Sequence, residues 1–142
     1  MFEKLLVALD GSEPSKRALA AATELARLAN AEVHIVHIAE SEMLMGGGGF
    51  SGGDVLEGSR GALSIADAAV ADLKQAGIDA TSTVERGMVG SVAAEILRIA
   101  EEGKCTMVFI GVKGESKIRA LLVGSVTNKI VHLSKVPVVV VP

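Results

Sequence analysis

The chain is 142 residues long, which matches one domain with a substantial core and is short for two. Although 49% of the residues are apolar, runs such as residues 5–9 and 138–141 are too short to cross a bilayer, so we expect no membrane partner. The net charge is −3 and Trp and Tyr are absent. This composition lacks a basic surface with aromatic stacking platforms, which argues against polymeric nucleic acid as a partner.

Apolar runs rich in β-branched residues alternate along the chain with segments of helical spacing. In chain order, the predicted elements are a strand at 5–9, a helix at 13–29, a strand at 33–38, a helix at 62–76, a strand at 81–84, a helix at 92–102, a strand at 107–110, a helix from 125 that ends before 137, and a strand at 136–141. Ser12 is the expected N-cap of the first helix. Gly77 and Gly103 are expected to end the second and third helices with a positive φ.

The predicted strands lack polar and apolar alternation, which is typical of parallel strands buried on both faces. Their alternation with helices predicts one open, doubly wound α/β domain with helices on both faces of the sheet. In such sheets, ligands bind beyond the carboxyl ends of the strands, where the winding direction reverses. The loops that follow the strands are therefore the expected place of a site.

Residues 43–62 contain eight of the sixteen glycines. We predict a flexible loop at about 43–61, which is either a linker or a lid over a ligand. The stretch Gly58-Ser59-Arg60-Gly61 looks like a phosphate loop, but it follows no apolar strand, so we do not assign a site to it.

Few residues offer metal or catalytic chemistry. His34 and His37 are three apart on a predicted strand and so point to opposite faces, and His132 is isolated. The single cysteine, Cys105, cannot form a disulfide framework or a Cys-based zinc site, and we expect it to be buried and inert. The N-terminal stretch MFEKLLVALDGS lacks the layout of a secretory signal. A cytoplasmic location is therefore expected.

Three nucleotide or phosphate motifs are absent. No GxxxxGK[ST] occurs, and the first strand-to-helix turn has one glycine where a dinucleotide fingerprint needs three. A phospho-aspartate receiver would need an acceptor Asp after the third strand, where this chain has Glu85-Arg86-Gly87.

The stretch GVKGESKIRALLVGSV at 111–126 survives these exclusions. Gly111 and Gly114 follow a strand and would let backbone N–H groups approach an anion, while Gly124 and Ser125 open a helix whose positive end favours phosphate. An ordinary loop that leads into a helix is the alternative. Asp10 follows the first strand and would face the same crevice if the sheet reverses between the first and fourth strands; it could accept hydrogen bonds from a ribose or an adenine amino group, or only cap its own turn.

The motif VALDGS at 7–12, the pattern Gly111-x2-Gly114-x9-Gly124-Ser125 and the closing VPVVVVP together resemble the universal stress protein family, in its ATP-binding subclass, over the whole chain. The resemblance implies a Rossmann-like five-stranded sheet of order 3-2-1-4-5, with ATP at the carboxyl edge. It also implies a homodimer paired through the C-terminal strand and a role as a stress-response regulatory protein.

By the same resemblance, Asp10 would hold the ribose or adenine end, and Ile38 would line the adenine pocket. The residues that would surround the phosphates and ribose are Gly111, Val112, Gly114, Gly124, Ser125 and Val126. A Mg²⁺ ion, if bound, would be held mainly by phosphate oxygens.

This chain departs from the family pattern at two positions. Val112 stands where a small polar residue is frequent, so a side-chain hydrogen bond is missing there, and Thr106 stands where an Asp is frequent, which we expect to affect local capping more than binding. Lys113, Lys117 and Arg119 either add charge near the phosphates or form a solvated surface.

Binding without efficient catalysis is the preferred function, because no residue stands out as a general base or an arginine finger. A slow ATPase or phosphoryl-transfer enzyme and a ligand-free interaction module are the alternatives.

Overall fold

A computed structural model describes residues 1–41, 52–112 and 124–142, with only the backbone described at 40–41 and 52–59. The elements in chain order are β1 (Lys4–Ala8), α1 (Glu13–Ala29), β2 (Glu32–Ser41), α2 (Gly52–Gln75), β3 (Ala80–Met88), α3 (Val92–Glu102), β4 (Met107–Gly111), α4 (Ser125–Leu133) and β5 (Val138–Val141). The five strands form one sheet of order β3-β2-β1-β4-β5, and all four strand pairs are parallel. The predicted α/β fold class and strand order are therefore confirmed.

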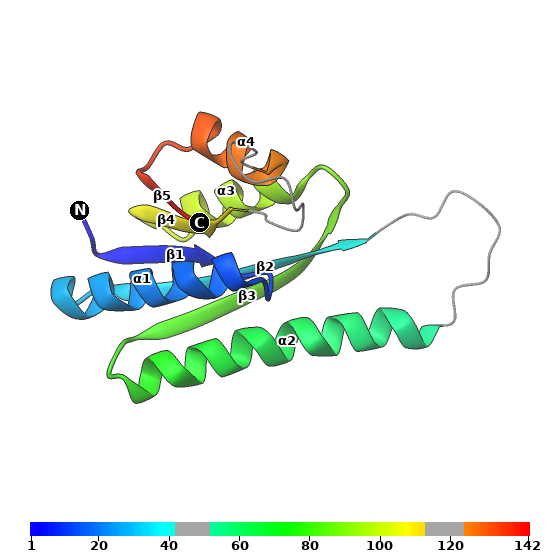
Figure 1. Cartoon of the computed structure of the whole chain (residues 1–142), viewed down its shortest axis with the longest axis horizontal. Coiled ribbons are helices and arrows are strands. Elements are labelled where there is room, and N and C mark those ends of the chain that lie inside the picture. Colours follow the sequence, from blue (N-terminus) through cyan, green and yellow to red (C-terminus); the bar gives the residue numbers. More distant parts are fainter. Residues whose placement is uncertain (42–51, 113–123) are drawn as a thin grey trace.

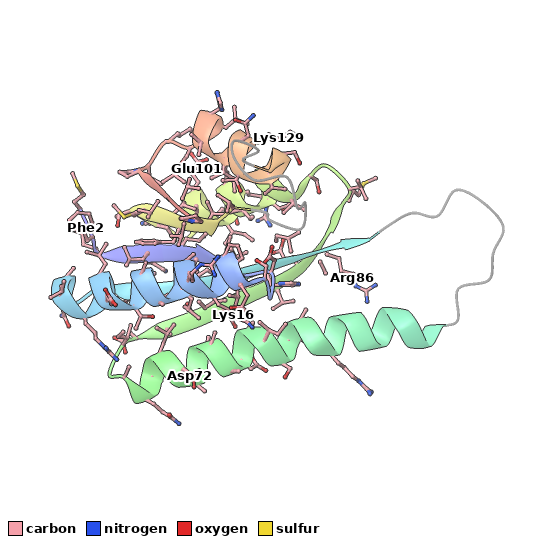
Figure 2. The ribbon with its side chains drawn as sticks, in the orientation of Figure 1. Phe2, Lys16, Asp72, Arg86, Glu101 and Lys129 are labelled. Atoms are coloured by element: carbon pink, nitrogen blue, oxygen red, sulfur yellow. The ribbon has the colours of Figure 1, made fainter. Side chains whose placement is uncertain are left out.

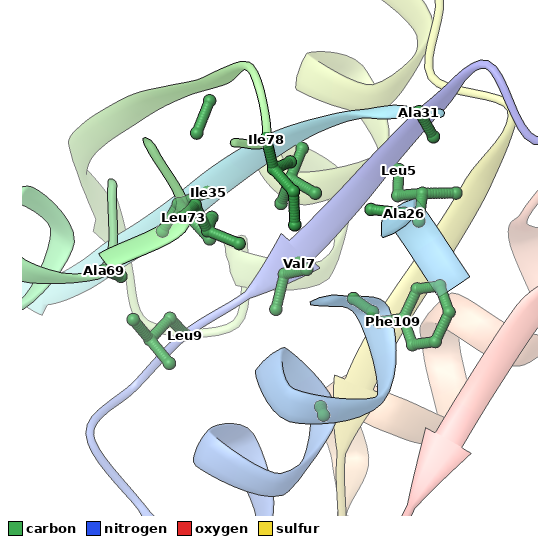
Figure 3. Close-up of a cluster of buried hydrophobic side chains, with 14 of the residues drawn as sticks. Leu5, Val7, Leu9, Ala26, Ala31, Ile35, Ala69, Leu73, Ile78 and Phe109 are labelled. Carbon is green, nitrogen blue, oxygen red and sulfur yellow. The ribbon is translucent and has the colours of Figure 1, made fainter. Parts of the chain in front are cut away.

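The helices cover both faces of the sheet, α1 and α2 on one side and α3 and α4 on the other (Figure 1). Alternate side chains of each strand enter two apolar cores, as the two-residue period of a strand requires. Leu5, Val7 and Ile35 pack under α1 and α2 (Figure 3), while Leu6 and Val36 pack under α3 and α4. Burial on both faces explains why the strands carry no polar alternation.

Helix α2 begins at Gly52, ten residues before the predicted start at 62. Glycine costs about 1 kcal/mol per residue in a helix interior, so the glycines made a loop the better prediction. Once a helix exists, however, each added residue forms one more backbone hydrogen bond, and this propagation carries the helix back to Gly52. Residues 52–61 of the predicted loop are therefore helical, and its residues 43–51 lie outside the described part of the chain.

The two predicted glycine stops behave differently. Gly77 follows α2 with φ +78°, as expected. Gly103 has φ −76°, so its predicted positive φ is wrong, and Lys104 adopts φ +53° in its place. The Cys105 amide then donates to the Ala100 carbonyl at 2.8 Å, while α3 itself ends at Glu102, as predicted.

The histidines and the cysteine have structural partners. The two ring nitrogens of His34 lie 2.7 and 2.9 Å from the hydroxyls of Thr81 and Thr83, and His37 Nδ1 lies 2.6 Å from the Leu9 carbonyl oxygen. Cys105 is buried as predicted, and burial raises the pKa of its thiol. Within the described residues no His, Cys, Asp and Glu side chains gather into a possible metal site. No helix in this part of the chain is long and apolar enough to cross a membrane.

Close packing joins the end of β4 to the start of α1. A Cβ atom added at Gly111 would lie 2.5 Å from the Pro14 carbonyl carbon and 2.6 Å from the Ser15 nitrogen. Both are backbone atoms, so they cannot move aside as a flexible side chain would. A glycine at the end of β4 therefore lets the first turn of α1 lie against the sheet.

We predict that Gly111→Ala lowers the free energy of unfolding by about 1–3 kcal/mol, because the new methyl group overpacks this contact. Urea-induced unfolding monitored by circular dichroism measures the change. Gly61→Ala is the matched control, since a Cβ there meets no atom within 4 Å and alanine favours helix α2. Equal midpoints for Gly111→Ala and the wild type would contradict the packing argument.

Candidate functional site

The order of the sheet places a crevice between β1 and β4. Each of these strands ends at the carboxyl edge, and the winding of the sheet reverses between them. A cavity of about 140 Å³ opens at this edge. It is lined by Ala8, Leu9, Asp10, Ser15, Val36, Ile38, Val92, Ile96, Ile110, Gly111, Val126 and Thr127.

Four of the predicted site residues line this cavity, namely Asp10, Ile38, Gly111 and Val126. They come from the turn after β1, from β2, from the end of β4 and from the first turn of α4, so segments far apart in the sequence meet at one place. The predicted residues Val112, Gly124 and Ser125 are described but do not line the cavity. Gly114 lies outside the described residues, as do Lys113, Lys117 and Arg119.

Asp10 is held by the turn between β1 and α1. The Ser12 amide donates to Asp10 Oδ1 at 2.9 Å, and Gly11 between them has φ +83°, a conformation that side chains rarely adopt. Ser12 also caps α1, because its hydroxyl oxygen accepts from the Ser15 amide at 3.3 Å. Asp10 thus shapes its own turn, and a carboxylate has acceptor capacity left for a ligand.

The electrostatics of this turn favour the ionised form of Asp10. Partial desolvation raises the pKa of the carboxyl, but hydrogen bonds from Ser12 and Ser15 outweigh this effect, so the pKa lies below its ordinary value. Asp10 is therefore an acceptor at neutral pH. Among the described residues that line the cavity, it is the one titratable side chain.

The N-terminus of α4 forms another wall of the cavity. Gly124 is the N-cap, and because glycine has no side chain, no side-chain cap hydrogen bond occupies the first amides of the helix. The first amides of α4 lack carbonyl partners within the helix and carry its positive dipole end. Val126 and Thr127 from this turn line the cavity, so the helix start is placed where an anion would be stabilised.

Thr127 links the two halves of the site, although the sequence did not single it out. Its side chain is buried, and its hydroxyl donates to the Gly111 carbonyl at 3.2 Å. This hydrogen bond holds the start of α4 against the end of β4. The tie depends on a contact between residues 16 positions apart, which no local pattern predicts.

The structure bears on one part of the prediction for Val112, namely its backbone amide. Its amide donates to the Val141 carbonyl at 2.8 Å, which extends the pairing of β4 with β5. This N–H group is therefore already used within the sheet and is not available to a phosphate. Thr106 lies at the other end of β4, where its hydroxyl donates to the Lys4 carbonyl at 3.1 Å, so its role is local, as expected.

The inner walls of the cavity are apolar. Val36 and Ile38 come from β2, and Val92 and Ile96 come from α3. Of these four, the sequence singled out only Ile38. The rule that ligands bind at the carboxyl ends of strands could have indicated Val36 as well, because Val36 lies two residues before Ile38 and therefore on the same face of the strand. Val92 and Ile96 enter through the packing of α3 on the sheet, for which the sequence carries no direct signal.

A second hollow of about 230 Å³ lies at the opposite edge of the sheet. It is lined by residues near the carboxyl ends of α3 and α4, among them Cys105 and Glu101. Glu101 is bound to Lys135 at 2.8 Å and lies on the α3 and α4 side of the molecule (Figure 2). This hollow has no contact with Asp10 or with the start of α4, so it is separate from the candidate site.

The lowered pKa of Asp10 predicts a pH dependence of stability. A carboxyl with a folded-state pKa below its unfolded value stabilises the fold above that unfolded value, and the contribution is lost as pH falls through the folded-state pKa. The wild type should therefore lose stability relative to Asp10→Asn between about pH 5 and 2, by less than about 1 kcal/mol for this exposed group.

Urea unfolding of the wild type and Asp10→Asn across this pH range measures the difference. Asp67→Asn, which removes an exposed carboxylate from α2, controls for the loss of one negative charge. Parallel pH profiles for the wild type and Asp10→Asn would show that the turn does not favour the ionised carboxylate.

Comparisons with known proteins agree with this geometry. The model of the universal stress protein family matches residues 1–142. Universal stress protein YxiE from Bacillus subtilis is 31% identical, with 99% of each chain covered.

Two solved structures carry nucleotides. The universal stress protein from Archaeoglobus fulgidus in complex with dAMP is 25% identical, with both chains covered in full and a TM-score of 0.69. A universal stress protein in complex with cAMP is 27% identical over 99% of this chain and 97% of the other, with a TM-score of 0.72. The chain therefore belongs to the universal stress protein family.

Proposed function

We propose that this chain is a cytoplasmic, homodimeric stress-response regulator that binds ATP at the carboxyl edge of its sheet. The observation that carries this proposal is the cavity between β1 and β4, where an ionised carboxylate, apolar walls and the start of α4 meet. Each of these features suits one part of an adenine nucleotide.

The apolar inner end suits the base. A planar purine would lie between Ile38 and Val36 of the sheet and Val92 and Ile96 of α3. Ligand pockets usually measure about 300–1,000 Å³, so the described cavity of about 140 Å³ would hold one end of a nucleotide. The rest of the ligand would extend along the carboxyl edge.

The polar rim suits the sugar and the phosphates. Asp10 is ionised at neutral pH and would accept a hydrogen bond from a ribose hydroxyl or from the adenine amino group. The amides at the start of α4, with the Ser125 hydroxyl, would donate to the phosphates. Thr127 supports this arrangement because it ties α4 to the end of β4.

Binding without rapid turnover fits the chemistry of the cavity. In the part of the chain that the structure describes, Asp10 is the one titratable residue that lines it, and it accepts a hydrogen bond from its own turn. No lysine or arginine from the described residues lines the cavity to stabilise charge at a transferred phosphoryl group. A Mg²⁺ ion would be held mainly by phosphate oxygens, since the described residues offer no cluster of ligands for it.

The nucleotide-bound relatives support the same assignment. The solved universal stress proteins in complex with dAMP and cAMP each match this chain over almost its whole length. Both of those ligands are adenine nucleotides with one phosphate. The proposal of ATP, and not a monophosphate, rests on the free amides at the start of α4, which could donate to further phosphates.

Isothermal titration calorimetry with ATP, AMP, dAMP, cAMP and GTP tests the proposal. We expect the wild type to bind the adenine nucleotides and to prefer ATP over GTP. Asp10→Asn keeps the acceptor used by Ser12 but loses the charge, so it should weaken ATP binding by about tenfold or more. Glu13→Gln, three residues away and outside the cavity, should leave affinity unchanged.

The comparison of AMP with dAMP separates the two roles of Asp10. A larger loss for AMP in Asp10→Asn assigns the carboxylate to the ribose 2′-hydroxyl, whereas equal losses assign it to another group of the adenine nucleoside. No binding of any adenine nucleotide at millimolar concentration would sink the proposal and favour a ligand-free interaction module.

The homodimer is proposed from the free edge of β5. Among the described strands β5 pairs with β4 alone, and its four valines are all partly exposed. The carbonyls of Pro137 and Val141 accept from β4, so by alternation the backbone groups of Val138 and Val140 point outward. Such an apolar edge is a template for pairing with a second copy.

Sedimentation velocity tests the dimer, which should have twice the 14.5 kDa mass of one chain. Val140→Pro removes an outward N–H group without breaking the ladder to β4, so we expect it to shift the equilibrium toward the monomer. Val139→Pro, which removes an inward N–H group, is the control and should lower stability instead. A monomeric wild type at tens of micromolar would contradict this edge as a dimer interface.

A further inference from the structure

Gly87 lies near the end of β3, on the sheet face that α3 covers. It is buried and does not itself line the cavity. In the ladder between β2 and β3, Gly87 is opposite Glu40 and Ile38 is opposite Glu85, so Ile38 and Gly87 are diagonal neighbours. Of the β2 residues that line the cavity, Ile38 lies nearest the carboxyl end of the strand.

The side chain of Ile38 occupies the space that a side chain at position 87 would take. A Cβ added at Gly87 would lie 2.8 Å from Ile38 Cγ2 and 3.1 Å from Ser91 Oγ. Gly87 does not have a positive φ, so its backbone would accept any residue. Space for Ile38, and not backbone conformation, is therefore what requires glycine here.

The surroundings of Gly87 are held firmly. The ladder between β2 and β3 runs from Val33 opposite Ala80 to Ser41 opposite Met88. Ser91 is anchored through its hydroxyl, which donates to the Met88 carbonyl at 2.8 Å. An ion pair of 2.7 Å between Arg98 and Glu85 joins α3 to β3. Ile38, which borders the cavity, is therefore the group that would yield.

We propose that Gly87 is a positioning residue that sets the width of the base end of the cavity through Ile38. This inference rests on the nucleotide-binding function proposed above. With glycine at 87, Ile38 leans over β3 and leaves room for a purine. A larger residue at 87 would push Ile38 toward the cavity and narrow the space for the base.

A larger residue at position 87 would weaken only the binding of the base. Gly87 and Ile38 lie on β3 and β2, whereas the proposed phosphate donors lie at the start of α4. A change at Gly87 should therefore weaken adenosine, AMP and ATP by the same factor. A change that disturbed the whole site would also alter what the phosphates contribute to affinity. Adenosine and ATP would then be weakened by different factors.

The test is a double-mutant cycle measured by calorimetry with adenosine and ATP. Gly87→Ala should weaken both ligands by about tenfold, as expected for one overpacked methyl group. In an Ile38→Ala background, which removes the clashing Cγ2, the same change should have little further effect. Gly61→Ala is the control, because a Cβ there meets no atom within 4 Å.

Three results of these binding measurements would overturn the inference. A loss that persists in full in the Ile38→Ala background would show that Gly87 does not act through Ile38. A loss for ATP without a loss for adenosine would place its effect at the phosphates. A third cycle, with Ser91→Ala, identifies the start of α3 as the route if the loss disappears there instead, which also overturns the proposal.

A ligand-free measurement separates this inference from the proposed function. The Ile38 δ1 methyl resonance, assigned by its loss in Ile38→Ala, should shift in Gly87→Ala without any nucleotide. An unmoved resonance overturns the link between Gly87 and Ile38. A shifted resonance in a protein that binds no nucleotide supports the packing link and overturns the proposed function.

Discussion

The structure depends on the pairing of β1 with a parallel neighbour on each side. β2 follows in one direction and β4 in the other, so the chain reverses its winding at β1. Leu5, Leu6 and Val7 are completely buried, which makes this strand the centre of both cores. The crevice at the carboxyl edge is a direct result of this reversal, because helices leave opposite faces of the sheet at that point.

A glycine and a hydrogen bond between elements bring the walls of the crevice together. Gly111 lets α1 approach the end of β4, and Thr127 holds α4 against the same strand end. The resulting site has an apolar interior with an anionic acceptor and the positive end of a helix at its rim. This combination suits a ligand with a neutral aromatic base at one end and negative charge at the other.

Much of the fold could be predicted because local patterns and tertiary packing agree. The helical spacing of the first and third helices gave the observed bounds 13–29 and 92–102, and the strands reflect burial on both faces. The start of α2 was missed because glycine propensity is a weak local signal that helix propagation overrides. The end of α3 at Glu102 was predicted correctly, but the positive φ expected at Gly103 is found at Lys104 instead.

Periodicity, strand ends and motif spacing are present in the sequence, and they predicted the fold class, the sheet edge of the cavity and the family resemblance. Strand ends and spacing indicated Asp10 and Gly111, the resemblance added Ile38 and Val126, and all four line one cavity. Packing between elements shows in addition that the Val112 amide belongs to the sheet, that Thr127 ties α4 to β4 and that Gly87 makes room for Ile38. These roles arise from contacts between elements, which spacing along one chain does not encode.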